Sequence, residues 1–327
     1  MMGMDIDAVR TARAAIAGYL EPTPAWGSPA LDEVTGASVV IKHEEVQPTG
    51  AFKVRGGLNL LAAMTPAERA RGVVSASTGN HGQSLAYAAA ALGGRCRIVM
   101  PEPANPTKVR ALRGWGAELV VHGDTMEVAA AHAHELAGRD GARFVHPADE
   151  PALIAGVGTL YMELLTAHPE LDYLLVPVGG GSGAAAACLV AASVAPGCRV
   201  IAVQSAESCA AHDSWRAGRL LDRPNRTVLE GLAIGSGFAT TQAVLRRHLA
   251  DFVLVEDEQV RAAQLLLLTH AHTLAEGAGA ASLAGLLAVA PRLAGARVGI
   301  VVTGGNASPA ELATVLASAP TPAVPAA

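Results

Sequence analysis

The sequence is poor in the features that mark nucleic-acid-binding, membrane-spanning and disulfide-bonded proteins. The net charge is −5 and no block of basic residues occurs, which argues against binding to nucleic acid or an anionic membrane. No apolar run reaches the roughly 18 to 20 residues of a transmembrane helix. The four cysteines are scattered without a CxxC pair, and we recognise no leader segment. We therefore expect a globular protein in the cytoplasm.

Lysine is also rare. Only three of the 24 basic residues are lysines, namely Lys42, Lys53 and Lys108. Lys53 has the most unusual setting, because it follows a Pro-Thr-Gly turn and lies between an aromatic residue and a valine. A desolvated lysine loses proton affinity and becomes a nucleophilic amine suited to Schiff-base chemistry. An ordinary half-exposed helix lysine also fits residues 48–57, so this segment alone leaves both interpretations open.

Short apolar segments alternate with helical patterns along most of the chain. We expect a helix over 5–19, strands over 39–42 and 298–302, helices over 258–274 and 278–289, and an irregular polar section over 205–226. Strands that alternate with helices of about 10 to 15 residues predict parallel sheets covered on both faces. We predict two open, twisted α/β domains, with the smaller (49–146) inserted into the larger (1–48 and 147–315), and a disordered tail over 316–327.

Polar motifs follow the expected strands, at the sheet edge where ligands bind in such folds. Residues 77–81 join a strand to a helix and read Ser-Thr-Gly-Asn-His. Unpaired N–H groups and the helix dipole attract a carboxylate there, and Ser77, Thr78 and Asn80 add donors. A plain N-cap, with His81 in solvent, is the alternative interpretation.

A second motif, residues 179–183, places four glycines and Ser182 after the most apolar strand. Glycines let the backbone approach a phosphate closely, and successive N–H groups cradle it. The Lys-Ser/Thr ending of a P-loop and the acidic ribose partner of a dinucleotide fold are missing. A phosphate carried by something other than a nucleotide fits best, although a flexible turn would look similar.

Thr303 places a hydroxyl after the last expected strand, and by itself this signal is weak. Together, a rare lysine, a carboxylate site, a phosphate cradle and a hydroxyl fit a pocket for pyridoxal phosphate and an amino acid. The combination resembles the fold-type II pyridoxal-phosphate enzymes, whose fold is that of the tryptophan synthase β chain. Within them it is similar to the serine/threonine dehydratase and serine racemase group, from about Pro22 to Asn306.

The resemblance implies a role for each motif residue. Lys53 would be the Schiff-base lysine, with Phe52 beside the cofactor ring, and Thr78 would be a second catalytic residue on the opposite face. Thr303 would meet the pyridine nitrogen, with Glu276 in the same pocket. The substrate carboxylate would bind at Ser77, Thr78, Gly79, Asn80 and His81, with Asn80 also bonding the phenolic oxygen. The phosphate would bind at Gly179, Gly180, Gly181, Ser182 and Gly183.

Some positions depart from the family pattern. Ser182 replaces the fourth loop glycine, and Thr303 stands where dehydratases more often have serine or cysteine. Gln204 and Ala210 occupy positions where metal-dependent members carry a glutamate and an aspartate, so we expect no metal site. Leu229-Glu230-Gly231 replaces the familiar Ala-Asp-Gly, so we expect a different side-chain pocket.

The resemblance implies α,β-elimination from a β-hydroxy-α-amino acid such as L-threonine or L-serine, which gives a 2-oxo acid and ammonia. The hydroxyl of Thr78 leaves racemisation open as an alternative. A cofactor-binding protein without turnover and a nucleotide-binding module remain as readings from other classes. The resemblance also implies a homodimer that acts on a small-molecule amino acid. We expect no feedback control by a fused amino-acid-sensing domain.

Overall fold

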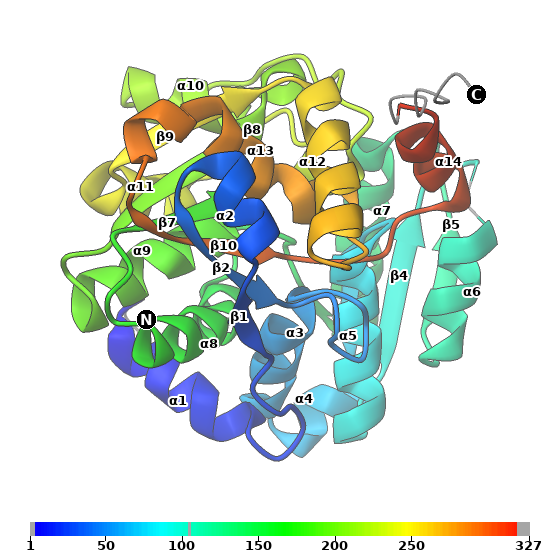
Figure 1. Ribbon diagram of the computed structural model, residues 1–327. Helices are drawn as coiled ribbons and strands as arrows, with labels where there is room; N and C mark the ends of the chain where they lie inside the picture. The colour runs from blue at the N-terminus through cyan, green and yellow to red at the C-terminus, as the bar shows by residue number, and fades with distance from the viewer. Residues whose placement is uncertain (1–3, 104–105, 319–327) are drawn as a thin grey trace.

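Two separate β-sheets organise the chain (Figure 1). The computed structural model describes residues 4–103 and 106–318. The larger sheet has six strands, which lie side by side in the order β1 (Ala25–Gly27), β2 (Ser38–His43), β10 (Arg297–Val302), β7 (Tyr173–Pro177), β8 (Arg199–Ser205) and β9 (Asp251–Val255). Within it only β1 and β2 pair antiparallel, and the other neighbours are parallel.

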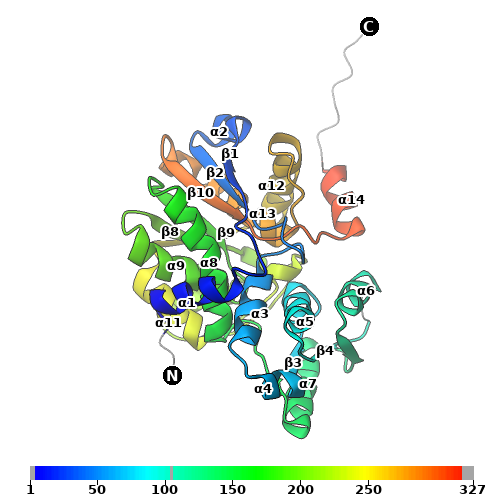
Figure 2. The same cartoon turned by 90° about the horizontal axis from the view of Figure 1, so that it is seen from below.

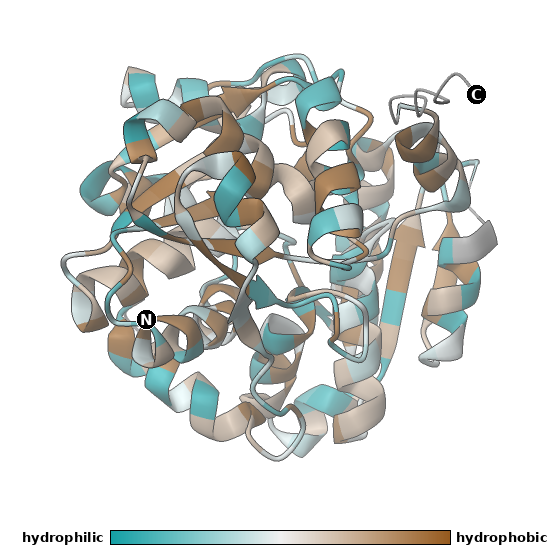
Figure 3. Ribbon diagram, in the orientation of Figure 1, coloured by the Kyte–Doolittle hydropathy of each residue, from teal (hydrophilic) through white to brown (hydrophobic). Residues whose placement is uncertain are grey.

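Apolar side chains cover both faces of the larger sheet, because successive residues of a strand point to opposite sides. In β7, Leu174 and Val176 join one core cluster and Leu175 joins another. The first face is covered by α1 (Ile6–Ile16), α8 (Pro151–Ala167), α9 (Ser182–Val194), α10 (Ala210–Ala217) and α11 (Ala239–His248). The second face is covered by α2 (Pro29–Thr35), α12 (Asp257–His270) and α13 (Gly277–Leu293). The strands are accordingly mostly brown (hydrophobic) in Figure 3, whereas the outer helices carry both brown and teal (hydrophilic) residues.

The smaller sheet is parallel throughout and has helices on both faces. Its strands lie in the order β5 (Glu118–Val121), β4 (Cys96–Met100), β3 (Val73–Ala76) and β6 (Arg143–Phe144). Its helices are α3 (Lys53–Ala62), α4 (Pro66–Arg71), α5 (Asn80–Leu92), α6 (Pro106–Gly114) and α7 (Met126–Asp140). The side chain of Val73 packs toward α3 and α5, and that of Val74 packs toward α7. Since α3 also packs against α8, it joins the two sheet units (Figure 2).

Local sequence signals fix where several helices begin and end. Ser28 caps α2, with Pro29 at its first position, and Gly36 ends it at φ 68°. Thr125 caps α7 and Gly141 ends it at φ 63°. Side-chain caps satisfy free N–H groups, and glycine adopts the left-handed conformation without strain. In the part of the chain that the structure describes, no helix is both long and apolar enough to span a bilayer.

The predicted fold class is confirmed, with differences in individual elements. The helix expected over 5–19 is shorter, and the strand expected over 39–42 is longer by one residue at each end. The section over 205–226 is not wholly irregular, since it contains the 3₁₀ helix η1 (Ala206–Ser208) and α10. The elements that were not predicted include the antiparallel β1, β9, and the helices α2, α4, α8 and α11. Uniformly apolar segments such as α8 give little periodic signal, because both their faces are buried.

The prediction of a disordered tail over 316–327 is wrong at its start. The last described helix, α14 (Pro309–Ala317), extends through residues 316 and 317. Ser308 and Glu311 form a reciprocal capping box, and Pro309 occupies the first helical position. These signals were readable in the sequence, because a serine three residues before a glutamate marks a helix start. Residues 319–327 of the predicted tail lie outside the described residues.

Candidate active site

One cavity of about 800 Å³ collects the predicted site residues. Its walls include the segments that follow β3, β7 and β10, because parallel strands bring their carboxyl ends to one edge. The sequence-predicted residues that line it are Phe52, Lys53, Ser77, Thr78, Gly79, Asn80, His81, Gly179, Gly180, Gly181, Ser182, Gly183, Glu276 and Thr303. Residues far apart in the sequence therefore share one site, while the role of each stays a prediction.

Lys53 begins α3, and its amine lies against the start of α9. The Nζ atom donates a hydrogen bond to Ser182 Oγ at 3.0 Å. The backbone N–H of Phe52 donates to the carbonyl of Thr303 at 2.9 Å, which attaches the lysine segment to the end of β10. Burial lowers the pKa of Lys53 from 10.5 to about 8. Part of the amine is therefore unprotonated in neutral solution, as a nucleophile or base requires.

The glycine loop before α9 has the geometry of a phosphate cradle. Among the described residues, no side chain caps α9, so its first N–H groups are open to a ligand. Gly181 adopts φ 90°. A Cβ at Gly179 would lie 2.3 Å from the Gly231 carbonyl oxygen, and one at Gly180 would lie 2.4 Å from Ala148 Cβ. Side chains are thus excluded where the backbone must approach an anion.

A second helix, α5, begins at the wall of the same cavity. Within the described part of the chain it also lacks a side-chain cap at its N-cap residue, Gly79. Ser77 Oγ accepts hydrogen bonds from the N–H groups of Gly79 at 3.2 Å and Gly82 at 3.0 Å. These two bonds do not use the hydroxyl proton of Ser77, which can be donated to a ligand. Two helix N-termini at one cavity suit two separate anionic groups.

Asn80 links the two sheet units across the cavity. Its Nδ2 donates to Glu276 Oε1 at 2.6 Å, and its Oδ1 accepts from Asn306 Nδ2 at 2.8 Å. One N–H of the Asn80 amide is not used by these bonds and can be donated to a ligand. Burial raises the pKa of Glu276 from 4.5 to about 7, although the Asn80 hydrogen bond lowers it. Glu276 therefore fixes the orientation of Asn80 while carrying an unfavourable buried charge.

We expect Glu276→Gln to stabilise the cofactor-free protein at pH 8.5 but not at pH 4. The pKa of about 7 in the folded protein lies above the usual glutamate value of 4.5, so the stability that protonation of Glu276 contributes is lost as pH rises through 7. Each pKa unit corresponds to about 1.4 kcal/mol. Melting temperatures at both pH values measure the effect, with the exposed Glu135→Gln as control. If Glu276→Gln and Glu135→Gln changed the melting temperature equally at both pH values, the raised pKa of Glu276 would be contradicted.

Several cavity residues were not assigned to the site from the sequence, and one of them contacts Glu230 of the segment for which a different side-chain pocket was expected. Lys108 and Glu230 form an ion pair at its wall, and burial lowers the pKa of Lys108. Asn306 and Glu311 also line it. The rarity of lysine was the one signal in the sequence that could have pointed to Lys108. Its pairing with Glu230 could not be predicted, because the two residues come from distant segments. Within residues 4–103 and 106–318, no group of three or more His, Cys, Asp or Glu residues could hold a metal ion.

The amine of Lys53 and the glycine cradle fit pyridoxal phosphate, which needs an amine for its aldehyde and N–H donors for its phosphate. Fold and site together define a fold-type II pyridoxal-phosphate enzyme. The family model described as "Pyridoxal-phosphate dependent enzyme" matches residues 16–304. The chain therefore belongs to this family, in the group of the serine/threonine dehydratases and serine racemases, and pyridoxal phosphate is its cofactor.

Individual relatives resemble this chain in sequence and in structure. The chain is 34% identical over 302 residues to the L-threonine ammonia-lyase of Thermotoga maritima, which covers 92% of this chain and 75% of the relative. It superposes on the processed form of threonine deaminase isoform 2 from Solanum lycopersicum with a TM-score of 0.91, 26% identity, and coverage of 95% and 87%. Maize serine racemase gives a TM-score of 0.90, 29% identity, and coverage of 96% and 97%.

Proposed function

We propose that this enzyme removes water from a β-hydroxy-α-amino acid such as L-threonine or L-serine and yields a 2-oxo acid and ammonia. The observation that carries the proposal is the Lys53 amine, held 3.0 Å from Ser182 Oγ in a cavity with two helix N-termini at its wall. The names of the Thermotoga maritima and Solanum lycopersicum relatives support the same reaction type.

The start of α5 would hold the substrate carboxylate. Its backbone N–H groups carry the positive end of the helix dipole, and the free proton of Ser77 adds a donor. Thr78, Asn80 and His81 also line the cavity. Anchoring the carboxylate at this helix fixes which bond of the substrate points toward Lys53.

Lys53 would remove the proton from Cα. Bound pyridoxal phosphate supplies an electron sink for the electron pair that this proton leaves behind. A pKa of about 8 makes the lysine amine a usable base in neutral solution. The start of α9 would hold the phosphate group through its open N–H groups and the Ser182 hydroxyl.

Thr303 would favour elimination over other outcomes. It offers a neutral hydroxyl, which can bond a ring nitrogen without keeping that nitrogen protonated as a carboxylate would. The Thr303 hydroxyl would in this way favour expulsion of the β-hydroxyl from the substrate. The hydroxyl leaves with a proton as water, and the released enamine adds water to give the 2-oxo acid and ammonia.

Racemisation is a second candidate, because Thr78 places a hydroxyl in the cavity that Lys53 also lines. A hydroxyl on the face opposite the lysine can return a proton to Cα with inverted configuration. Maize serine racemase, with a TM-score of 0.90, has the same fold. The added methyl group of threonine leaves less room for this second proton path than serine would.

Incubation with L-threonine and with L-serine in deuterated water tests both candidates. We expect 2-oxo acid and ammonia in equal amounts from at least one substrate, and D-amino acid with deuterium at Cα only as a minor product. Absence of 2-oxo acid from every β-hydroxy-α-amino acid tested, with the cofactor bound, would refute elimination. D-serine as the main product would favour racemisation instead.

Three further predictions accompany this function. We propose that the two sheets are the cores of two domains, with 49–146 as the smaller domain inserted in the larger. We also propose a homodimer and a location in the cytoplasm. Size-exclusion chromatography with light scattering tests the homodimer, and cell fractionation tests the location in the cytoplasm.

A further inference from the structure

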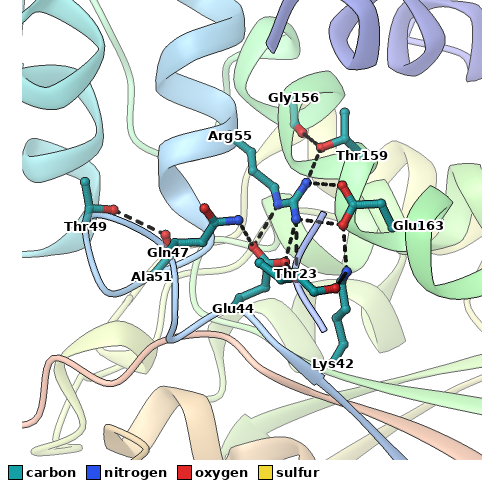
Figure 4. A network of polar contacts seen from close by, with 10 residues as sticks. All are labelled: Thr23, Lys42, Glu44, Gln47, Thr49, Ala51, Arg55, Gly156, Thr159 and Glu163. Atoms are coloured by element: carbon teal, nitrogen blue, oxygen red, sulfur yellow. Dashed lines mark hydrogen bonds and ion pairs between the residues drawn. The ribbon is translucent and has the colours of Figure 1, made fainter. Parts of the chain in front are cut away.

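A buried network of charged and polar side chains lies beneath the helix that begins with Lys53. Figure 4 shows the Arg55 guanidinium between the carboxylates of Glu44 and Glu163. The side chains of Arg55 and Glu44 are 1% and 0% exposed. Lys42 Nζ lies 2.6 Å from Glu163 Oε2, and these side chains are 1% and 13% exposed. Two positive and two negative groups are therefore enclosed together, which burial tolerates only when each is paired.

Arg55 uses its whole guanidinium in this network. Its Nε and Nη2 donate to the two carboxylate oxygens of Glu44, each at 2.8 Å. Its Nη1 and Nη2 donate to Glu163 at 2.6 and 2.8 Å, and Nη1 also donates to Thr159 Oγ1 at 3.0 Å. All five N–H groups are thus engaged in a planar arrangement that the compact ammonium of lysine cannot reproduce.

The network joins three elements at the start of α3. Arg55 lies in the first turn of α3, two residues after Lys53, while Glu44 directly follows β2 and Glu163 belongs to α8. Helices α3 and α8 also meet closely, because a Cβ at Gly156 would lie 2.5 Å from the Arg55 carbonyl oxygen. The side chain and the backbone of Arg55 are therefore both held by α8, which leaves the first turn of α3 little freedom to move.

The network does not act on Lys53 through its charge. Two cations and two anions balance, and burial is the cause of the lowered pKa of Lys53. His81 of α5, which is electrostatically coupled to Lys53, has a pKa that burial lowers to about 3, so it is uncharged in neutral solution. The network can therefore affect the pKa of Lys53 only through the position of the amine, because the depth of burial determines how far the amine is desolvated.

We propose that Arg55 is a positioning residue, which through Glu44 and Glu163 holds the first turn of α3 so that the Lys53 amine stays in the desolvated position beside Ser182. The inference rests on Lys53 as the cofactor lysine of the proposed function. The proposal can be tested without measuring enzyme activity, because the pKa of the Lys53 amine reports directly on the contact of this amine with water.

Labelling of the full-length chain, freed of cofactor, with trace acetic anhydride over a range of pH tests the proposal. Mass spectrometry of the Lys53 peptide gives the apparent pKa of this amine. The variants are Arg55→Lys, which keeps the charge of the network, and Glu44→Gln, which preserves shape. Loss of the Glu44 charge would by itself lower the Lys53 pKa, so a rise in this variant reports that the amine has moved toward water. Leu61→Ala is the matched control, because Leu61 is buried at the far end of the same helix and is not part of the network. Melting temperatures are recorded for all of them.

We expect the Lys53 pKa to rise from about 8 toward 10.5 in Arg55→Lys and Glu44→Gln, and to stay unchanged in Leu61→Ala. Each unit of increase lowers labelling at pH 7 about tenfold, since less free amine is present. An unchanged Lys53 pKa in both network variants, with melting temperatures lowered as in the control, would overturn the proposal. An equal pKa increase in Leu61→Ala would also overturn it, because general loosening would then be sufficient. Neither result depends on which substrate the enzyme uses.

Discussion

Replacement of Lys53 by alanine is expected to reduce 2-oxo acid formation by a factor on the order of 10²–10⁴ or more, the usual contribution of a positioned general base. The lysine is expected to act twice, as the amine that holds the cofactor and as the base at Cα. No other lysine can substitute for it, because Lys42 is paired with Glu163 and Lys108 with Glu230. The measurement is initial rate at saturating cofactor.

Lys53→Arg is the informative comparison for this variant. Arginine keeps a positive charge and a long side chain, but its guanidinium stays protonated and does not act as a base. If charge near Ser182 were the important property, Lys53→Arg would retain activity while Lys53→Ala would lose it. Loss in both variants, with unchanged circular dichroism, is the result that the proposed role requires.

Gly179→Ala is expected to weaken pyridoxal phosphate binding by about tenfold to a hundredfold. The added Cβ would lie 2.3 Å from the carbonyl oxygen of Gly231, and a backbone atom cannot rotate away. Overpacking of this kind costs about 1–3 kcal/mol, and every 1.4 kcal/mol is a factor of ten in affinity. The loop must therefore shift, and the N–H groups before α9 lose their alignment with the phosphate.

The same substitution elsewhere provides the control. Gly197 lies in the turn after α9, and a Cβ there would have no described atom within 4 Å. Gly197→Ala is therefore expected to bind the cofactor like the unmodified protein. Fluorescence titration with pyridoxal phosphate measures both variants. Equal affinity of Gly179→Ala and Gly197→Ala would show that the loop does not need a bare backbone at this position.

Much of the fold was accessible from the sequence because its local signals agree with its tertiary structure. Short apolar strands alternating with helices predicted two α/β units, and the motifs at residues 77–81 and 179–183 lie directly after strands, as expected. Helices α8 and α11 escaped detection. A helix such as α8, buried on most of its surface, lacks the polar face that reveals a 3.6-residue period.

The networks around the site were not accessible in this way. Arg55 and Glu163 are separated by 108 residues, and their sequence contexts give no hint that they meet. The close approach of α3 and α8 at Gly156 decides this contact. Likewise, Asn80 and Glu276 come from different sheet units, 196 residues apart. Side-chain pairing across units depends on how helices pack, which local patterns do not encode.

The sequence by itself determined the class of site, because the rare Lys53, the glycine loop and the polar strand ends fit one cofactor together, although each motif alone leaves another interpretation open. Only the tertiary structure decided the state of these groups. The pKa of Lys53 falls to about 8 because the cavity walls desolvate it, and that of Glu276 rises to about 7 for the same reason. Desolvation is a property of the folded surroundings, so it appears only when distant segments enclose the residue.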